Sequence, residues 1–301
     1  MHYLLLILTP LLFLISGCSK APEPLQHKEI CQSDIYAMRS AECIDMERLL
    51  EKIEPYQIIF VGDHHDSSES HAFTAGLIGE LDQKGYRIHL ANEWFSPEDN
   101  ALLSEYADKK FNDGNFTKKI AWKKKAGYDF ELFAPIYHAV QEADGELYGI
   151  NLSKAFQKRI SDQNISGMSE SEKVFYDTLD LNVSAHQQML SPFFSHCHRL
   201  KKVETQEACQ GRMNRVQVAW DTMMARESAV LADTVLKTKK DKLIVFAGSM
   251  HLAYSLGVNL RFGRYSDLPY VTILPEVRSD SGMEHGLADY LFLYSSKQPD
   301  E

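Results

Sequence analysis

The chain has 301 residues, of which 44% are hydrophobic and 25% charged, and its formal net charge at pH 7 is −10. This acidic balance argues against a nucleic-acid partner, because binding to phosphates needs clustered positive charge. A chain of this length can bury a large core, as one domain or as a domain with a cap.

The chain opens with an apolar run from Leu4 to Ile15 that ends in Gly17-Cys18. The run is about 12 residues long, which is the length of a signal-peptide core and too short to span a bilayer. Small residues before a cysteine resemble the lipobox of bacterial lipoproteins. We therefore expect residues 1–17 to be a lipoprotein signal peptide and Cys18 to carry the lipid. The run lacks a basic residue near its start, and the alternative is an ordinary secretory peptide with a chance cysteine.

Residues 18–28 are rich in Ala, Pro, Glu, Gln and Lys and predict a flexible tether. Several acyl chains on Cys18 would hold the remaining residues, 29–301, stably at a membrane. We expect a location at the bacterial cell envelope, and Ser19 after the cysteine favours the outer membrane.

Four further cysteines predict disulfides, because an even number is typical of exported proteins. Three pairings are open, and the simplest joins Cys31 to Cys43 and Cys197 to Cys209, since each pair brackets a polar stretch. Metal binding is the alternative, with His196 and His198 beside Cys197, but the sequence has no C-x-x-C.

Apolar runs alternate with helical segments along the chain. Strands are predicted at 57–61, 87–92, 146–150, 243–247 and 270–274, with an edge strand at 290–294. A helix is expected from Ser67 to Lys84, with Ser67 or Ser68 as its N-cap and Gly85 as the residue that ends it. Another helix starts at Ser96 as N-cap, with Pro97 in the first position. This order predicts an α/β fold with a mostly parallel sheet covered by helices.

Two long helical stretches, 97–145 and 153–240, are inserted after strand ends. We expect them to form a helical cap over the carboxyl edge of the sheet. Open α/β proteins bind their ligands at that edge.

Polar side chains follow four predicted strands and would meet at this edge: Asp63, His65, Glu93, Asn151 and His251. We call these five residues the rim. Two of the strand ends share the form Gly-x-x-His, in which the glycine would let the chain turn sharply. Each rim residue alone is more often structural, but the repeat favours a site. His65, Glu93 and His251 could bind a divalent metal, or the rim could act in acid–base catalysis.

The motifs between residues 57 and 274 resemble the ChaN family, iron-regulated haem-binding lipoproteins of the Tiki superfamily. The resemblance rests on Val61-Gly62-Asp63-His64-His65-Asp66, Glu93-Trp94-Phe95, Tyr148-Gly149-Ile150-Asn151, Ala219-Trp220-Asp221-Thr222-Met223-Met224-Ala225, Ala247-Gly248-Ser249-Met250-His251 and Leu256-Gly257-Val258. Asp63 stands where the family usually has glutamate, so its carboxylate reaches one methylene less far.

The resemblance implies an α/β domain with a helical cap that holds haem between two subunits. It also implies a Tyr as iron ligand, with His and Lys near the propionates. Because a Tyr phenolate suits ferric haem, Tyr254, Tyr128 and Tyr137 are candidates. His138 and Lys125 are their basic neighbours. Weaker candidates for haem or metal are His186, His196 and His198.

The expected function is that of a haem-binding envelope lipoprotein that assists iron or haem acquisition. We expect a homodimer, with an outer-membrane haem or iron receptor as a further partner. The alternative is a metal-dependent or His/Glu-dependent hydrolase of the Tiki and erythromycin-esterase type, working at the rim.

Overall fold

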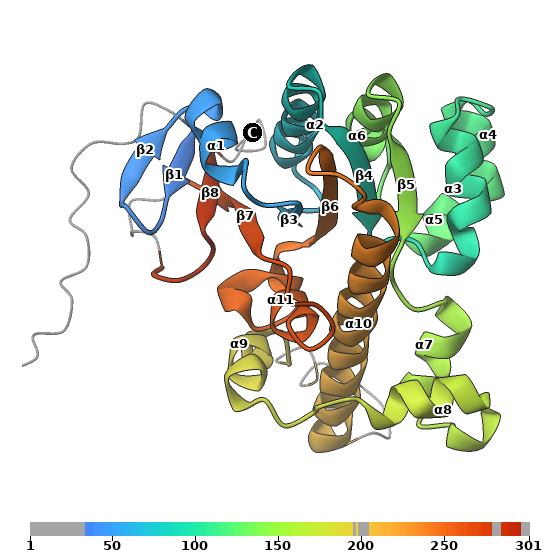
Figure 1. Ribbon diagram of the computed structural model, residues 1–301. Helices are drawn as coiled ribbons and strands as arrows, with labels where there is room; N and C mark the ends of the chain where they lie inside the picture. The colour runs from blue at the N-terminus through green and yellow to red at the C-terminus, as the bar shows by residue number, and fades with distance from the viewer. Residues whose placement is uncertain (1–33, 195–196, 198–204, 279–283, 296–301) are drawn as a thin grey trace, which may run out of the picture.

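The computed structural model describes residues 34–194, 197, 205–278 and 284–295 (Figure 1). Within them lies one eight-stranded sheet in the order β2-β1-β8-β7-β3-β6-β4-β5. The strands are β1 (Ile35–Ala37), β2 (Glu42–Ile44), β3 (Ile58–Asp63), β4 (Arg87–Asn92), β5 (Glu146–Gly149), β6 (Asp241–Gly248), β7 (Tyr270–Val277) and β8 (Tyr290–Tyr294). The expected α/β fold is confirmed.

The six neighbouring strands β8, β7, β3, β6, β4 and β5 are parallel to one another. The β1 strand pairs antiparallel with both β8 and β2. The strand predicted at 290–294 is present, but its prediction as an edge strand is wrong. The β1 strand of the β1–β2 hairpin pairs with the side of β8 that does not face β7, and Ile35 of β1 stands opposite Phe292 of β8.

The α-helices are α1 (Met46–Ile53), α2 (Ser68–Gln83), α3 (Asn100–Ala107), α4 (Asp113–Lys119), α5 (Trp122–Lys125), α6 (Phe130–Glu142), α7 (Lys154–Ser161), α8 (Glu170–Asp177), α9 (Ser184–Phe194), α10 (Gln206–Val235) and α11 (Val258–Phe262). Short 3-10 turns lie at Pro97–Asp99, Ile165–Gly167, Ser249–His251 and Ala253–Ser255.

Local capping chemistry determines where the predicted helices begin. The Ser67 hydroxyl accepts a hydrogen bond from the Ser70 backbone N–H at 3.1 Å, so Ser67 is the N-cap of α2. Ser96 and Asp99 form a capping box around the turn that Pro97 opens, ahead of α3. The helix start signals read from the sequence are therefore confirmed.

Helices cover both faces of the sheet, as continuous apolar strands require. Ile59 and Val61 of β3 face a core shared with α1, α2 and α6. Ile58 and Phe60 point the other way, into a core shared with α10 and α11. The alternation along one strand shows that the sheet is buried on both sides.

The two helical insertions lie in different places. α6 packs against α2 and α3 packs against β5, so most of the first insertion lies beside the sheet. α7, α8 and α9 gather around the part of α10 that extends past the sheet (Figure 1). A small core with Phe156, Phe175 and Met223 joins α7 and α8 to α10. Of the helices in the described ranges, none has the length and apolar character needed to cross a membrane.

Candidate functional site

The rim forms where β3, β4 and β6 end side by side. Nε2 of His65 lies 3.6 Å from Oε1 of Glu93, and Nε2 of His251 lies 3.6 Å from Oε2 of the same carboxylate. The Gly248 backbone N–H donates to Glu93 Oε2 at 2.9 Å. Parallel pairing of β6 with both β3 and β4 thus brings two imidazoles to one carboxylate.

A buried aspartate orients each rim histidine through its other ring nitrogen. Asp63 contacts His65 Nδ1 with one carboxylate oxygen and His71 Nε2 with the other, both at 2.7 Å. Asp221, in the middle of α10, contacts His251 Nδ1 at 2.5 Å and His186 Nε2 at 3.1 Å. Both rim imidazoles are therefore held in place by a carboxylate that is itself shared with a buried histidine.

The charges of these groups are coupled. Burial disfavours the charged form of His65, but the hydrogen bond to Asp63 and the charge of Glu93 outweigh it and raise the His65 pKa. Burial acts in the same way on His251, and Asp221 with Glu93 raises the His251 pKa. Burial would raise the pKa of Asp63 and of Asp221, but their histidine partners hold both pKa values below the ordinary range. The directions of these four shifts favour the charged forms of His65 and His251 beside the charged forms of Asp63 and Asp221.

The glycines of the two Gly-x-x-His segments provide space. The chain turns directly after Gly248 into the 3-10 turn Ser249–His251. Neither Gly62 nor Gly248 has a positive φ, so a left-handed backbone is not the reason for glycine at these positions. A Cβ on Gly248 would lie 2.9 Å from Cε1 of His65. A Cβ on Gly62 would collide with the side chain of Leu274 and lie 2.8 Å from Ser249 Oγ. The missing side chains let the two strand ends and the His65 ring pack closely.

Asn151 supports the rim without presenting its side chain to it. Its Nδ2 donates to the backbone carbonyl of Glu93 at 3.0 Å, and its Oδ1 accepts from the Leu152 N–H at 2.7 Å. The expected metal set of His65, Glu93 and His251 does come together. However, no group of three or more His, Cys, Asp or Glu side chains in the described part of the chain is arranged to hold a metal ion.

A pocket of about 510 Å³ opens beside the rim, and we call it the rim pocket. Its volume lies within the usual range for small-molecule sites. One wall is apolar and comes mainly from α9 and α10, and the other is polar and follows β3 and β6. The pocket is lined by Asp63, His64, His65, Asp66, Tyr128, Leu190, Phe193, Phe194, Met213, Gln217, Gly248, Ser249, Met250 and His251.

The structure separates the three predicted tyrosines. Tyr128 lines the rim pocket, with its ring 5.3 Å from that of His65. Burial and then the charges of Asp66, Asp63 and Glu93 raise the Tyr128 pKa. Tyr137 lies fully buried in the core and stacks on Phe130, so it faces no pocket. Tyr254 packs against the core that α10 and α11 share with the sheet, and it does not line the rim pocket.

The predicted basic neighbours are engaged elsewhere. His138 lies 3.0 Å from Asp113 and lines a separate hollow with residues of α2. Lys125 pairs with Asp99 at 2.8 Å. His186 is buried in the Asp221 network, while His196 and His198 lie outside the described residues. None of the three described side chains lines the rim pocket.

Sequence reasoning gave no role to Asp221, His71 or His64. Asp221 lay inside a motif that carried the family resemblance, and its position in an otherwise apolar helix segment was the available signal. His71 lies eight residues after Asp63, on α2, and only the fold brings the two together. His64 stands next to His65 in the same segment, and residue type alone does not distinguish the two.

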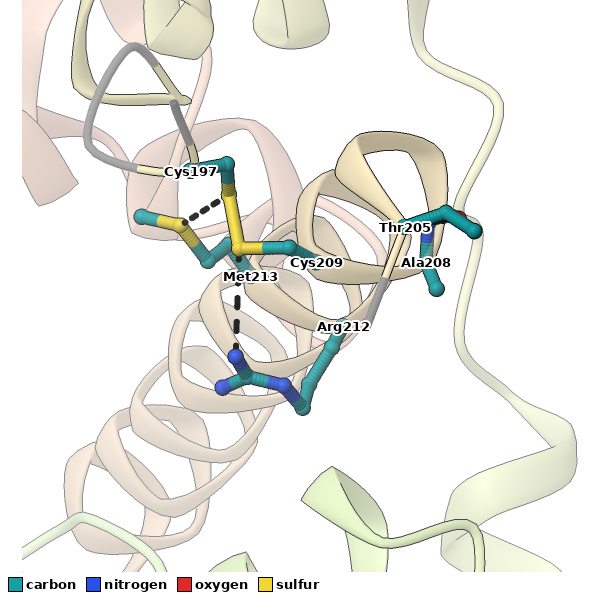
Figure 2. Close-up of a disulfide and its surroundings, with 6 residues drawn as sticks. All are labelled: Cys197, Thr205, Ala208, Cys209, Arg212 and Met213. Carbon is teal, nitrogen blue, oxygen red and sulfur yellow. Dashed lines mark hydrogen bonds between the residues drawn. A yellow bond between two sulfur atoms is a disulfide. The ribbon is translucent and has the colours of Figure 1, made fainter. Parts of the chain in front are cut away.

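A disulfide joins Cys197 to Cys209, as the simplest pairing predicted (Figure 2). Cys197 Sγ also lies 3.4 Å from the sulfur of Met213, which lines the rim pocket. Figure 2 shows the three sulfur atoms grouped on one side of α10. The bond thus fixes the chain after α9 against the apolar wall of the pocket. Cys43 lies on β2, whereas its expected partner Cys31 lies outside the described residues.

The fold and the rim define an α/β protein with a pocket at the carboxyl edge of its parallel strands. Residues 49–262 match the model of one family, described as haem-binding uptake, Tiki superfamily, ChaN. The chain belongs to this family. The resemblance seen in the sequence motifs is thereby confirmed.

A solved structure supports the fold. A ChaN of Campylobacter jejuni, described as binding haem cofacially, matches with a TM-score of 0.67 and 17% identity, covering 87% of this chain and 98% of that one. An erythromycin esterase mutant in its open conformation matches with a TM-score of 0.47 and 12% identity, covering 80% and 74%. No curated protein matches the sequence.

Proposed function

We propose that the protein binds haem in the rim pocket and assists iron or haem acquisition at the bacterial cell envelope. The observation that carries this is the pocket itself, in which an apolar wall faces an imidazole-rich one. Haem needs both, because its macrocycle is apolar and its iron takes a nitrogen, oxygen or sulfur ligand. Membership of a haem-binding family supports the same ligand.

The residues present fit this group. Leu190, Phe193 and Phe194 of α9 would pack against the macrocycle, together with Met213 and Met250. Polar side chains on the opposite wall can approach the iron. Bound haem would supply the iron that the protein carries as its cargo.

A homodimer would complete the pocket. Phe193 is 44% exposed and Tyr128 is 37% exposed, and both lie on the pocket wall. Exposed aromatic side chains at a pocket favour a covering partner. A second copy that covers them would also shield the haem from water. Sedimentation of the purified protein with and without haemin tests this, and we expect a haem-stabilised dimer.

The envelope location rests on Cys18. In the full chain, Cys18→Ser should move the protein from the membrane fraction to the soluble fraction. Retention of the variant in the membrane would contradict the lipid anchor. An outer-membrane receptor for haem or iron is the expected partner of the anchored protein.

Haemin titration tests ligand binding directly. The mature protein should give a saturable change in the Soret band with a defined stoichiometry. A matched variant, Phe193→Asp, introduces a charge into the apolar wall and should weaken binding by about tenfold or more, since an unpaired charge there must lose its water. The absence of a saturable change in the wild type would refute the proposal.

A hydrolase is the second candidate, and the geometry around Glu93 favours it. Two oriented imidazoles with raised pKa values lie 3.6 Å from one carboxylate, an arrangement suited to acid–base chemistry. Esterase substrates with a chromogenic leaving group test it, with Glu93→Gln as the inactive control. Elemental analysis for zinc, manganese and cobalt tests the metal-dependent form of this candidate.

A further inference from the structure

Aromatic rings lead from the rim pocket into the core beside α6. His65 and Tyr128 line the pocket, and their rings lie 4.7 Å and 5.9 Å from the ring of Trp94, measured between centroids. Trp94 lies in the turn after β4, and its ring is 6.2 Å from that of Trp122 on α5. The side chain of Trp122 is buried. Neighbouring rings thus connect the pocket wall with the interior of the protein.

The rings continue to two buried tyrosines. Trp122 lies 6.3 Å from Tyr137, and Tyr137 lies 6.4 Å from Tyr106 of α3, again between ring centroids. Both tyrosine side chains are completely buried. Tryptophan and tyrosine lose one electron more readily than other aromatic or aliphatic side chains, so neighbouring rings of these types can pass an electron in short steps. We call Trp94, Trp122, Tyr137 and Tyr106 the ring series.

The two tyrosines of the ring series differ in the partner of the hydroxyl. The Tyr106 O–H donates to Oδ1 of Asp113 at 2.7 Å, whereas the Tyr137 hydroxyl accepts from the side-chain amide of Asn92. A tyrosine that has lost an electron releases its phenolic proton. A carboxylate can accept this proton, and an amide N–H cannot. Of the two tyrosines, Tyr106 is therefore the one at which an oxidation can be stabilised as a neutral radical.

Asp113 connects Tyr106 with the surface. Its carboxylate lies 3.0 Å from Nε2 of His138, and both side chains are partly exposed. Burial would raise the pKa of Asp113, but the hydrogen bonds from Tyr106 and His138 hold this pKa below the ordinary value. The carboxylate is therefore ionised at neutral pH and can take a proton from Tyr106 and release it to water.

We propose that the ring series carries electrons from Tyr106 to a peroxide that reacts at haem in the rim pocket, with Asp113 as the proton acceptor. This inference rests on the proposed haem-binding function. Haem supplies the chemistry that breaks the O–O bond when it is bound. The protein would then have a peroxidase activity in addition to ligand binding.

Electrons and protons balance in two equal steps. Reduction of one hydrogen peroxide to two waters takes two electrons and two protons. Each oxidation of Tyr106 sends one electron along the ring series and one proton to Asp113 and then to water, while the open pocket takes up one proton from water. A dissolved one-electron reductant such as ascorbate returns an electron and a proton to each tyrosyl radical. Two molecules of reductant are therefore consumed for each peroxide.

Two methionines give the ring series a purpose. Met213 and Met250 line the rim pocket, and oxidants convert methionine to the sulfoxide. A sulfoxide in the apolar wall would be polar where the ligand needs an apolar surface. Electrons that arrive from Tyr106 would reduce the peroxide before it oxidises these side chains.

Electron paramagnetic resonance of the ferric haem complex, frozen soon after mixing with hydrogen peroxide, provides the test. The wild type should show a tyrosyl radical, whose lines narrow when the tyrosines are ring-deuterated. Tyr106→Phe should lose this signal. Trp122→Phe should lose it too, and mass spectrometry should detect more sulfoxide at Met213 and Met250. Asp113→Asn should slow radical formation by about 100-fold or more, the lower end of what a positioned proton acceptor contributes.

Tyr148→Phe is the matched control. The Tyr148 hydroxyl also donates to a carboxylate, that of Glu146, but its ring lies beside His89 and outside the ring series. This variant should leave the radical signal and the methionine oxidation unchanged. Circular dichroism and haemin titration of each variant show whether it folds and binds haem.

The outcomes separate the two proposals. A wild type that binds haemin but forms no tyrosyl radical, or an unchanged signal in folded Tyr106→Phe, would overturn the inference and leave haem binding intact. A wild type that binds no haemin would overturn the proposed function and this inference with it.

Discussion

Asp221 on α10 lies 2.5 Å from Nδ1 of His251, a residue of the turn after β6. The carboxylate is completely buried, and its other oxygen lies 3.1 Å from His186 and 3.7 Å from Arg261. A single side chain therefore ties the rim to α9 and α11. The rim histidine is oriented from the insertion as much as from the sheet.

Asp221→Asn should destabilise the protein strongly. The substitution removes the negative charge that faces Arg261 and His251, and breaking a buried ionic network costs about 3 kcal/mol or more. It should also lower the pKa of His251, because Asp221 is the main partner that raises it. Urea unfolding measures the first effect, and NMR titration of the histidine measures the second.

The control for this variant is Asp233→Asn, an exposed aspartate on the same helix. An exposed substitution of this kind changes stability by about 0.5 kcal/mol or less. Equal stability losses in the two variants would mean that the Asp221 network does not hold the rim.

Gly248→Ala should displace His65. The new Cβ would lie 2.9 Å from Cε1 of that ring, closer than the packed strand ends tolerate. Overpacking of this kind costs about 1–3 kcal/mol. We expect lower stability in urea unfolding and a shifted imidazole signal for His65 in NMR spectra.

Gly79→Ala, in the middle of α2, should change the stability in the opposite direction. Nothing lies within 4 Å of a Cβ at this position, and alanine restricts the unfolded chain, so the variant should gain about 0.4–1 kcal/mol. A loss of stability at Gly79, or none at Gly248, would show that space does not explain these glycines.

The strand ends of the rim could be predicted because apolar runs mark the strands and polar residues end them. Parallel strands deliver their carboxyl ends to one edge, so Asp63, Glu93 and His251 could be assigned to one site from the sequence alone. The close contact of His65 with Gly248 could not be predicted from the sequence, because it depends on β3 and β6 being neighbours in the sheet. Strand order is set by packing across the whole domain, and no local pattern encodes it.

Two further features could not be predicted from the sequence, for different physical reasons. The β1–β2 hairpin has strands of three residues, too short for any hydrophobic period to appear. Tyr137 was a haem candidate by its residue type, yet its hydroxyl accepts from Asn92 Nδ2 at 2.9 Å inside the core. Residue chemistry alone does not distinguish a buried phenol from one that faces a pocket.

Lys242 predicts a pH dependence of stability. Its ammonium group is buried at the amino end of β6 and donates to the backbone carbonyls of Glu54 and Tyr56, just after α1. Burial lowers the pKa of Lys242 to about 8, below the ordinary value of 10.5. Between these two values the unfolded chain binds a proton that the folded chain does not.

The stability of the wild type should therefore rise relative to Lys242→Met as the pH increases from 8 to 10.5, by at most about 3 kcal/mol. The comparison of two chains at each pH cancels the titration of all other groups. Lys239→Met, which removes an exposed lysine nearby, should show no such trend. A constant difference between wild type and Lys242→Met would mean that the buried lysine keeps its proton throughout.

The Cys197–Cys209 disulfide should matter for the ligand as well as for the fold. It closes a loop of 12 residues, and removing such a bond typically costs about 2–4 kcal/mol. Cys197 Sγ also contacts Met213, so the bond holds the chain after Phe193 and Phe194 against α10. Without it, Cys197 is no longer tied to α10, and the apolar wall of the rim pocket loses this attachment.

The double variant Cys197→Ser/Cys209→Ser should therefore unfold at lower urea concentration and also bind haemin more weakly while still folded. Reductant is a poorer test, because Cys43 is disulfide-bonded too and would be reduced at the same time. Met213→Leu, which keeps the bond and the apolar volume, should change haemin affinity little. If the double variant loses stability but keeps its full haemin affinity, the disulfide stabilises the insertion without shaping the pocket, and the apolar wall must be held by α9 and its buried His186 alone.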